Sequence, residues 1–469
     1  MEKHQFSFSE DDIPMMEYAN IFLGNSIWMK AGKGFEEATF EITVRDIPKN
    51  WGYLIMYGLD RFLTYVQNFG FSKEDVELLK KMNLITEEQT EYYRNFKFHG
   101  SVWSIEEGVP FFAGEPILRI TGPMAEVNLM TALALNAFSY PIRVLTKAAR
   151  VKVASKDKLF SPAAAVVRAQ GFEQVIIGQK AAYLTGPINP IQPNFYKSKE
   201  FENAKFNFQP NINHATIKSF DNEREAIKLA LKEILPRFTM LQIMVDTYNM
   251  KEGLKTLMQE MKGLPQKELE KIYVPIDSGD VLKTAKYMRK ELDKHKFNTV
   301  KIVAFSNLEE YKIKKLVDTN TPIDYYICVT EVTNVSDAPS LEMVFKMSEV
   351  RYPNGKIEYK AKLTKGKESF PGRKQIFRNY DEKGLMKGDI IGLETEKLGE
   401  ALLVKFISNG ERLIAREDLF ATKDRFLKNF KQIPKNYKNI YCKDKFPVEA
   451  SKELKKLLKI VKKKHLKKH

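Results

Sequence analysis

Residues 272–306 read IYVPIDSGDVLKTAKYMRKELDKHKFNTVKIVAFS, and this stretch decides the fold. It holds two short apolar runs, Ile272–Ile276 and Val300–Phe305, separated by a helical pattern over Asp280–Lys294. Short apolar runs bounded by turn residues are typical of buried strands, and strands that alternate with helices pair in parallel. The stretch therefore predicts one strand–helix–strand unit of a parallel sheet.

The same alternation continues on both sides. The apolar run Leu241–Val245 and a helical pattern over Lys251–Met261 precede the stretch. A helical pattern over Leu308–Val317 and the apolar run Tyr325–Val329 follow it. The repeat is about 30 residues, the length of one βα unit. We therefore predict an α/β region with a parallel sheet over residues 141–340.

The segments that flank this region carry mixed patterns. Residues 1–140 predict an α+β domain, and residues 341–450 predict a β-rich segment that packs on it, with Gly and Pro in the turns. The expected N-terminal elements are a strand at 36–45, a helical apolar stripe from Leu54 to Val66, a helix starting after Ser72, strands within 99–120 and a buried helix at Ala125–Phe138. The expected C-terminal strands lie at 342–347, 356–362 and 401–407.

Composition limits the class of protein. Hydrophobic residues make up 43% and charged residues 29% of the 469 residues, which are globular proportions. The chain has no apolar run of 18 residues and no apolar segment at its polar N-terminus, so we expect neither a membrane span nor a secretory signal. Its two cysteines, Cys328 and Cys442, lack metal-ligand spacing and fit a reducing compartment, so we expect a cytoplasmic protein.

The last nineteen residues are strongly basic. The formal charge of the chain is 76 − 60 = +16, and residues 451–469 contribute nine lysines and one glutamate, a net +8. Leucine and valine recur among these lysines at roughly helical spacing. The tail is either an arm that attracts nucleic acid or another polyanion, or a solvated terminal helix, and the second reading is favoured.

A small polar residue follows each of the four predicted strands. These residues are Asp246, Asp277, Ser306 and Thr330. Side chains at the carboxyl ends of parallel strands converge on one face, where barrel enzymes carry their active sites. Four such residues in succession predict a functional site at this edge.

The segment Asp277-Ser278-Gly279-Asp280 passes from a strand through a tight turn into a helix. Amide groups at a helix N-terminus favour an anion, and Asp277 could bind sugar hydroxyls. Helix capping by Ser278 or Asp280 explains the same residues equally well.

Histidine and several cations supply further candidates. His214 lies mid-chain, and Asp246 could orient it through a carboxylate–imidazole hydrogen bond. Lys147, Arg150 and Arg168 lie on short helical or turn segments and carry the charges that a phosphorylated substrate needs. A structural histidine and ordinary surface cations are the alternatives.

Taken together, these segments resemble nicotinate phosphoribosyltransferase, in the right order from about Phe40 to about Gly399. No single segment is decisive, but their order and spacing are fairly specific. The segments that carry the resemblance are Phe40–Arg45, Gly58–Arg61, Gly114–Arg119, Thr146–Arg150, Arg168–Gly171, His214-Ala215, Val245-Asp-Thr-Tyr248, Asp277–Asp280, Ser336–Pro339 and Pro371–Arg378.

The resemblance implies an irregular α/β barrel of the type II phosphoribosyltransferase kind, with a second domain built from both chain ends. It implies a homodimer with shared active sites, and the transfer of a phosphoribosyl group from 5-phosphoribosyl 1-diphosphate to nicotinate. It implies that ATP, used with Mg²⁺, phosphorylates a histidine that matches His214. It also implies that Asp277 binds ribose hydroxyls and that Thr330 lies where the 5-phosphate binds, with no resident metal ion.

The sequence departs from the family pattern at several positions. Pro275 and Val167 stand where the family has arginines, and Ile327 and Val329 replace two glycines of a phosphate loop. Asp12-Ile13-Pro14 stands for an aromatic motif that stacks on nicotinate, and Asn211 for a threonine. A working nicotinate enzyme remains the favoured prediction. A non-catalytic binding protein and a transferase for another base, such as nicotinamide, are the alternatives.

Overall fold

The computed structural model describes residues 15–156, 158, 160–162, 171–186, 210–305 and 307–466. The chain divides into two compact units. Unit 1 consists of Met1–Arg143 together with Ser340–His469, and unit 2 consists of Val144–Pro339. Unit 1 is thus assembled from both ends of the chain, and unit 2 is one continuous segment.

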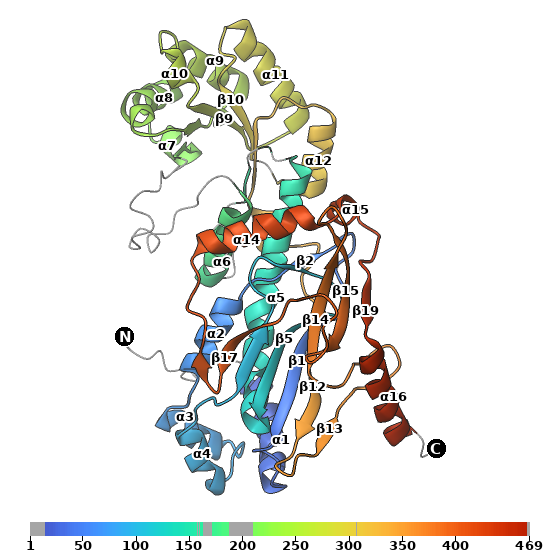
Figure 1. Cartoon of the computed structure of the whole chain (residues 1–469). Coiled ribbons are helices and arrows are strands. Elements are labelled where there is room, and N and C mark those ends of the chain that lie inside the picture. The colour runs from blue at the N-terminus through green and yellow to red at the C-terminus, as the bar shows by residue number, and fades with distance from the viewer. Residues whose placement is uncertain are drawn as a thin grey trace. The chain divides into compact units, whose positions relative to one another are not determined.

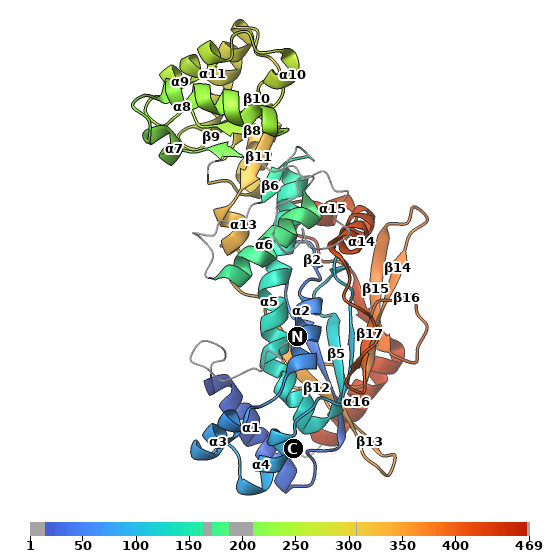
Figure 2. The ribbon, with the colours of Figure 1, turned by 90° about the vertical axis from the view of Figure 1, so that its left-hand side faces the viewer.

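Unit 2 contains a parallel sheet of six strands in the order β6-β11-β10-β9-β8-β7, in which every pairing is parallel. Figures 1 and 2 show helices gathered beside this sheet, and they follow the strands along the chain. The α/β class predicted for this region is confirmed. The strands are β6 (Phe160–Pro162), β7 (Asn211–Ile212), β8 (Leu241–Ile243), β9 (Ile272–Ile276), β10 (Lys301–Ala304) and β11 (Tyr325–Cys328). The helices are α6 (Phe172–Thr185), α7 (His214–Lys218), α8 (Glu223–Leu229), α9 (Met250–Glu260), α10 (Gln266–Leu269), α11 (Val281–Lys294), α12 (Glu310–Asp318) and α13 (Thr330–Asn334).

The central strands of this sheet are buried on both faces. All five residues of β9 are buried, as expected for a strand in a parallel sheet. Successive side chains point to opposite faces, so Tyr273 shares a face with Val303 and Ile327 of the neighbouring strands, and the three form one apolar cluster. Helix α11 packs against β9 and β10, and its buried residues follow helical spacing.

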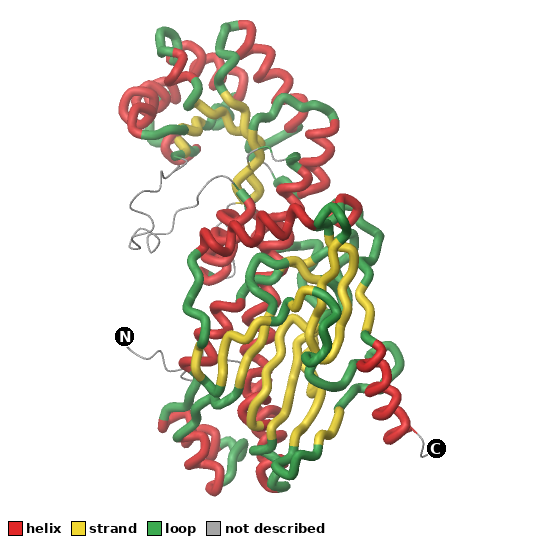
Figure 3. Tube along the Cα trace, viewed as in Figure 1, coloured by secondary structure: helices red, strands yellow, loops and turns green. Residues whose placement is uncertain are grey.

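Unit 1 is built on sheets whose strands pair antiparallel, except for the parallel pair β15 and β19. Its largest sheet has seven strands in the order β13-β12-β1-β5-β3-β17-β18, in which β1 from the N-terminal segment pairs with β12 from the C-terminal segment. A second sheet has the order β16-β14-β15-β19, and β2 pairs with β4. Figure 3 draws the strands of the molecule in yellow. The strands are β1 (Glu37–Val44), β2 (Leu54–Ile55), β3 (Ser101–Ser104), β4 (Pro110–Phe111), β5 (Pro116–Pro123), β12 (Met343–Arg351), β13 (Ile357–Tyr359), β14 (Lys374–Tyr380), β15 (Met386–Leu393), β16 (Glu400–Ala401), β17 (Val404–Ser408), β18 (Glu411–Arg412) and β19 (Val448–Ala450).

Two N-terminal predictions need correction, and the first concerns the helical stripe from Leu54 to Val66. Leu54 and Ile55 form strand β2, so the helical stripe begins only at Leu59, the first residue of α2. Gly58 causes this break, because its φ of 102° is a left-handed conformation that favours glycine. Ser72 caps the next helix as predicted. The helices of unit 1 are α1 (Met15–Lys30), α2 (Leu59–Asn68), α3 (Lys73–Lys81), α4 (Thr90–Arg94), α14 (Leu419–Gln432), α15 (Lys435–Lys438) and α16 (Lys452–Leu466).

The predicted buried helix is much longer than expected. Helix α5 runs from Met124 to Ala154 and continues through Pro141. Proline has no backbone N–H, so Pro141 cannot bond the carbonyl of Ala137 four residues earlier. A Cβ added to Gly58 would lie 2.3 Å from that carbonyl oxygen, so only glycine allows the chain to pass so close to the interrupted turn.

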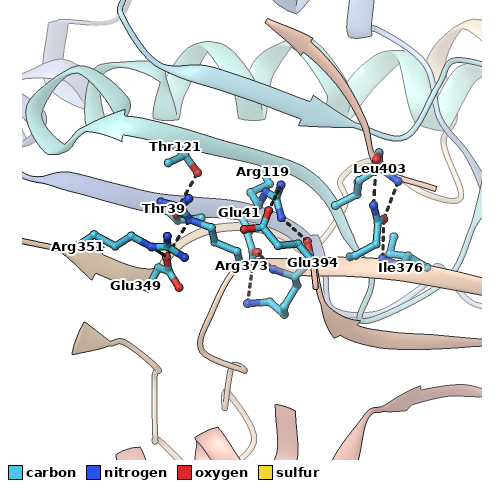
Figure 4. Close-up of polar contacts among 12 residues, drawn as sticks. Thr39, Glu41, Arg119, Thr121, Glu349, Arg351, Arg373, Ile376, Glu394 and Leu403 are labelled. Carbon is cyan, nitrogen blue, oxygen red and sulfur yellow. Dashed lines mark hydrogen bonds and ion pairs between the residues drawn. The ribbon is translucent and has the colours of Figure 1, made fainter. Parts of the chain in front are cut away.

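Unit 1 contains ion pairs between buried and partly buried side chains. Arg119 on β5 pairs with Glu394 at 2.8 Å, and its guanidinium lies over the ring of Trp103. Glu349 on β12 pairs with Arg351 at 2.7 Å and Arg373 at 2.8 Å (Figure 4). Side chains from distant segments therefore neutralise each other across the sheet.

The basic C-terminal segment forms helix α16. Leu454 and Val461 are buried, and the helix packs against β15. The exposed side carries lysines, of which Lys462 pairs with Glu368 at 2.7 Å. The segment thus packs on unit 1 through its apolar face, as the favoured reading of a solvated terminal helix requires. Nucleic-acid binding by its lysines remains the untested alternative. No helix in the described part of the chain is long and apolar enough to span a bilayer.

Candidate functional site

Three predicted catalytic residues converge in unit 2. His214 Nε2 lies 3.8 Å from Asp246 Oδ1 and 3.8 Å from Asp277 Oδ2. His214 follows β7, Asp246 follows β8 and Asp277 follows β9, and these three strands are neighbours in the sheet. The carboxyl ends of parallel strands thus bring together residues that are far apart in the sequence, as predicted.

Local structure fixes each of these residues. Asn213 caps α7 by accepting a hydrogen bond from Thr216 N at 3.0 Å, which makes His214 the first helical residue. The buried Ile217 anchors the same short helix on the sheet. Gly253 lets α9 approach the strand end, because a Cβ there would lie 2.1 Å from Val245 O, one residue before Asp246.

The histidine is oriented differently from the sequence prediction. Asp246 lies 3.8 Å from the ring, too far for the hydrogen bond that was predicted to orient His214. His214 Nδ1 is instead 2.9 Å from the hydroxyl oxygen of Thr247. Thr247 was not among the predicted site residues, although its position directly after Asp246 at a strand end was the available signal.

The two carboxylates have different environments. Ser278 donates a hydrogen bond to Asp246 Oδ2 at 3.1 Å, and Asp246 Oδ1 is buried without a hydrogen-bond partner among the described residues. Burial, and then repulsion by Asp246, raise the pKa of Asp277 above its usual value, while His214 opposes the shift. The pair therefore attracts protons and cationic groups.

The turn after β9 is open. Gly279 has a φ of 77°, and a Cβ added there would meet nothing within 4 Å. Asp280 caps α11 by accepting a hydrogen bond from Lys283 N at 3.1 Å, which lowers the pKa of its exposed carboxyl. Capping thus accounts for Asp280, and substrate binding by Ser278, Gly279 and Asp280 stays a prediction.

Two predicted phosphate ligands lie instead in a buried ion-pair cluster. Lys147 Nζ is 2.7 Å from Glu310 and 2.7 Å from Asp337, and Arg150 Nε is 2.9 Å from Glu310 Oε1. The side chains of Lys147 and Arg150 are 2% and 1% exposed. Burial would lower the pKa of Lys147, but Glu310 and Asp337 together raise it. The prediction of freely available cations at these positions is therefore corrected, because both charges are neutralised internally.

Some of the remaining predicted positions lie among the described residues, and others lie outside them. Thr330 begins α13 and is half-buried, and its contact with a phosphate stays a prediction. Arg168, Ser306 and Val167 lie outside the described residues. Ile327, in place of a family glycine, is buried against Tyr273 and Val303. Pro275 is buried in β9 beside Val303.

The arrangement combines an imidazole, two carboxylates and a glycine turn. Such a set can bind hydroxyl groups, hold a proton and support a nucleophilic nitrogen. In the described part of the chain, no group of three or more histidine, cysteine or acidic side chains could hold a metal ion.

Comparisons with known proteins agree on one family. The model for the nicotinate phosphoribosyltransferase N-terminal domain matches residues 22–139. Mycobacterium tuberculosis nicotinate phosphoribosyltransferase pncB2 is 29% identical over 394 residues, covering 84% of this chain and 81% of the relative. The Bacillus subtilis nicotinate phosphoribosyltransferase is 25% identical over 401 residues, covering 84% and 79%.

A solved structure supports the same fold over nearly the whole chain. Human nicotinic acid phosphoribosyltransferase aligns with a TM-score of 0.75 at 18% identity, covering 95% of this chain and 99% of the human chain. The predicted type II phosphoribosyltransferase fold is thereby confirmed. The order of motifs, the relatives and the fold agree, and together they support membership of the nicotinate phosphoribosyltransferase family.

Proposed function

We propose that this protein is a nicotinate phosphoribosyltransferase of NAD salvage. The observation that carries the proposal is the meeting of His214, Asp246 and Asp277 at the carboxyl ends of adjacent parallel strands in a member of this family. Named relatives from bacteria, a worm and a plant carry the same activity in their names.

The transfer breaks one bond and forms another at the same carbon. The ring nitrogen of nicotinate attacks C1 of the ribose, and the bond from C1 to the diphosphate oxygen breaks. Nicotinate mononucleotide and diphosphate leave. Positive charge develops on the ribose as the bond breaks. The negative carboxylates of Asp277 and Asp246 would stabilise this charge. Mg²⁺ accompanies the diphosphate as part of the substrate.

ATP would act through His214. The imidazole would accept the γ-phosphoryl group, releasing ADP, and water would later remove it as phosphate. A neutral imidazole nitrogen is a suitable nucleophile, and the adjacent carboxylates favour the positive charge that the ring gains. Hydrolysis of the phosphohistidine would then drive the transfer toward nicotinate mononucleotide.

We further propose a cytoplasmic homodimer with shared active sites. Leu23 and Ile27 on α1 are 46% and 69% exposed and lie one helical turn apart, which supports association through this helix. Cys328 and Cys442 are buried free thiols, which supports a reducing compartment. Light scattering coupled to size-exclusion chromatography would give the oligomeric state, and a monomer at micromolar concentration would reject the dimer.

The testing experiment is a product assay by mass spectrometry. Purified protein is incubated with 5-phosphoribosyl 1-diphosphate, ATP and Mg²⁺, with nicotinate in one arm and nicotinamide in another. The expected product is nicotinate mononucleotide, formed faster with ATP than without. If folded protein forms no mononucleotide from either base, the proposed transfer is wrong and a non-catalytic role replaces it.

Nicotinamide is the second candidate base. The buried Pro275 replaces an arginine that the family uses to contact substrate, and Tyr273, Val303 and Ile327 make the neighbouring face of the sheet apolar. An apolar face without that cation favours an uncharged ring over a carboxylate. Higher kcat/KM for nicotinamide than for nicotinate in the same assay would establish this specificity.

A further inference from the structure

The hydroxyl of Thr247 is the group that holds the His214 ring. Its Oγ1 lies 2.9 Å from Nδ1, within hydrogen-bond distance. The other ring nitrogen, Nε2, faces Asp246 and Asp277 at 3.8 Å each, beyond that distance. The ring is therefore fixed by a hydrogen bond on one edge and faces two carboxylates with the other.

The acceptors around the ring decide which nitrogen carries the proton. An ionised carboxylate only accepts hydrogen bonds, and Asp246 Oδ1 is buried without a hydrogen-bond donor in the described part of the chain. A bare Nε2 would turn its lone pair toward two carboxylates, whereas a protonated Nε2 turns a donor toward them. Nε2–H is thus the favoured form of the neutral ring. Nδ1 then keeps its lone pair, and the Thr247 hydroxyl, which can donate or accept, donates to it.

We infer that Thr247 is a positioning residue that holds the His214 ring with Nε2–H toward Asp246 and Asp277 and with Nδ1 as the basic nitrogen. The inference rests on the proposed function only for its effect on rate. A ring turned over by 180° would place carbon atoms where Nδ1 and Nε2 lie, and it would lose both interactions. The hydrogen bond from Thr247 therefore selects one of two ring orientations.

The first test measures the ring directly by ¹⁵N NMR of protein labelled at histidine. The chain has six histidines, and the spectrum of a His214→Asn variant identifies the His214 signals. At a pH where the ring is neutral, the wild type should show Nε2 protonated and Nδ1 unprotonated and hydrogen-bonded. In Thr247→Val, which keeps the side-chain shape without the hydroxyl, the Nδ1 signal should move toward that of a free imidazole. Thr247→Ser should restore it.

The second test uses rates. Thr247→Val should lower kcat by about 10- to 100-fold, because a lost hydrogen bond and a misplaced reacting group both slow the chemistry. KM for both substrates should change less than about 2-fold, since Thr247 holds the histidine and makes no proposed contact with either substrate. Thr247→Ser should stay within about 3-fold of the wild type, because the hydroxyl is kept. Thr284→Val on α11 is the matched control and should leave kcat unchanged.

The outcomes separate this inference from the proposed function. If the wild type makes no mononucleotide, the proposed function fails, but the NMR experiment still tests Thr247. A wild-type ring with the proton on Nδ1 overturns the inference. An Nδ1 signal that is identical in wild type and Thr247→Val also overturns it, and the wild-type and Thr247→Ser spectra decide the matter if the valine variant does not fold.

Discussion

Charged side chains have complete partners at Arg378 in unit 1 and incomplete partners at His214 in unit 2. In unit 1 the side chains of Arg378 and Asp389 are both fully buried, and three contacts of 2.6–3.2 Å join them. In unit 2 His214 and Asp277 are 35% and 38% exposed, their contact is 3.8 Å, and the nearby Asp246 keeps a buried oxygen without a hydrogen-bond donor in the described part of the chain. Arg378 also donates to Pro110 O at 2.9 Å, so each of its three guanidinium nitrogens makes a hydrogen bond.

Structural and functional charges differ in how completely their partners satisfy them. A charge whose partners are complete holds segments together and has nothing left for a ligand. A charge with an incomplete set of partners costs stability and stays available. By this criterion Lys147 and Arg150 belong with Arg378, although they lie in the same unit as His214 and share the partner Glu310.

The largest effect should come from breaking the buried cluster in unit 2. Glu310→Gln keeps the shape but leaves Lys147 and Arg150 without their shared anion, and removing one partner of a buried ion pair costs about 3–5 kcal/mol. Urea unfolding followed by circular dichroism measures this loss. Asp318→Asn on the same helix breaks an exposed pair with Lys314 and should cost at most about 1 kcal/mol. Equal costs for the two variants would contradict the comparison.

An intermediate effect, on rate rather than stability, should follow from Asp246→Asn. The change removes the charge of a carboxylate whose Oδ1 has no hydrogen-bond donor in the described part of the chain, so the free energy of unfolding should stay within about 1 kcal/mol of the wild type. The rate should fall by about 100-fold, because the neutral amide cannot stabilise positive charge on His214 or the ribose. A variant that lost several kcal/mol of stability while keeping its rate would place Asp246 among the structural charges.

A smaller effect concerns pH. The pKa of Asp277 is raised by burial and by Asp246, so the folded protein binds this proton more tightly than the unfolded chain. Stability should therefore decline as pH rises from about 4 through the raised pKa, and Asp277→Asn should remove that part of the decline. The difference in Tm between Asp277→Asn and the wild type should grow between about pH 4 and pH 7. A constant difference would show that the Asp277 carboxyl has no raised pKa.

The smallest effect should come from the lysines of α16. Replacing Lys452, Lys455, Lys459 and Lys463 by Gln changes only exposed side chains on the face opposite the buried Leu454. Rate and Tm should not change. Retention on nucleic acid should not differ from that of a control in which Lys97, Lys286, Lys383 and Lys443 are replaced, because a solvated helix contributes only net charge. A selective, salt-sensitive loss in the α16 variant would identify a polyanion site.

Hydrophobic pattern was sufficient to predict the order of elements in unit 2. The runs at 241–245, 272–276, 300–305 and 325–329 became β8 to β11, because each is a short apolar segment between turn residues. The pattern failed where backbone geometry determines where a helix begins or ends. Leu54 and Ile55 fit a helical stripe but end before the left-handed Gly58, and α5 continues through Pro141 although proline commonly ends a helix.

The sequence predicted which strand ends form the site, but not which side chains pair there. Strand order brings together residues at strand ends, so Asp246 and Asp277 could be predicted to meet near His214. Partners within hydrogen-bond distance depend on side-chain geometry that no pattern encodes. Thr247 was therefore missed beside Asp246, and Lys147 and Arg150 were predicted as ligands although the buried Glu310 neutralises them.

The most direct test of the account compares nicotinate mononucleotide formation by the wild type and by His214→Asn, with and without ATP. We predict that ATP accelerates the wild type, that the variant keeps only the ATP-independent rate, and that circular dichroism shows both proteins equally folded. ATP stimulation of equal size in the two proteins would contradict the assignment of His214 and of the open cluster around it as the reactive site.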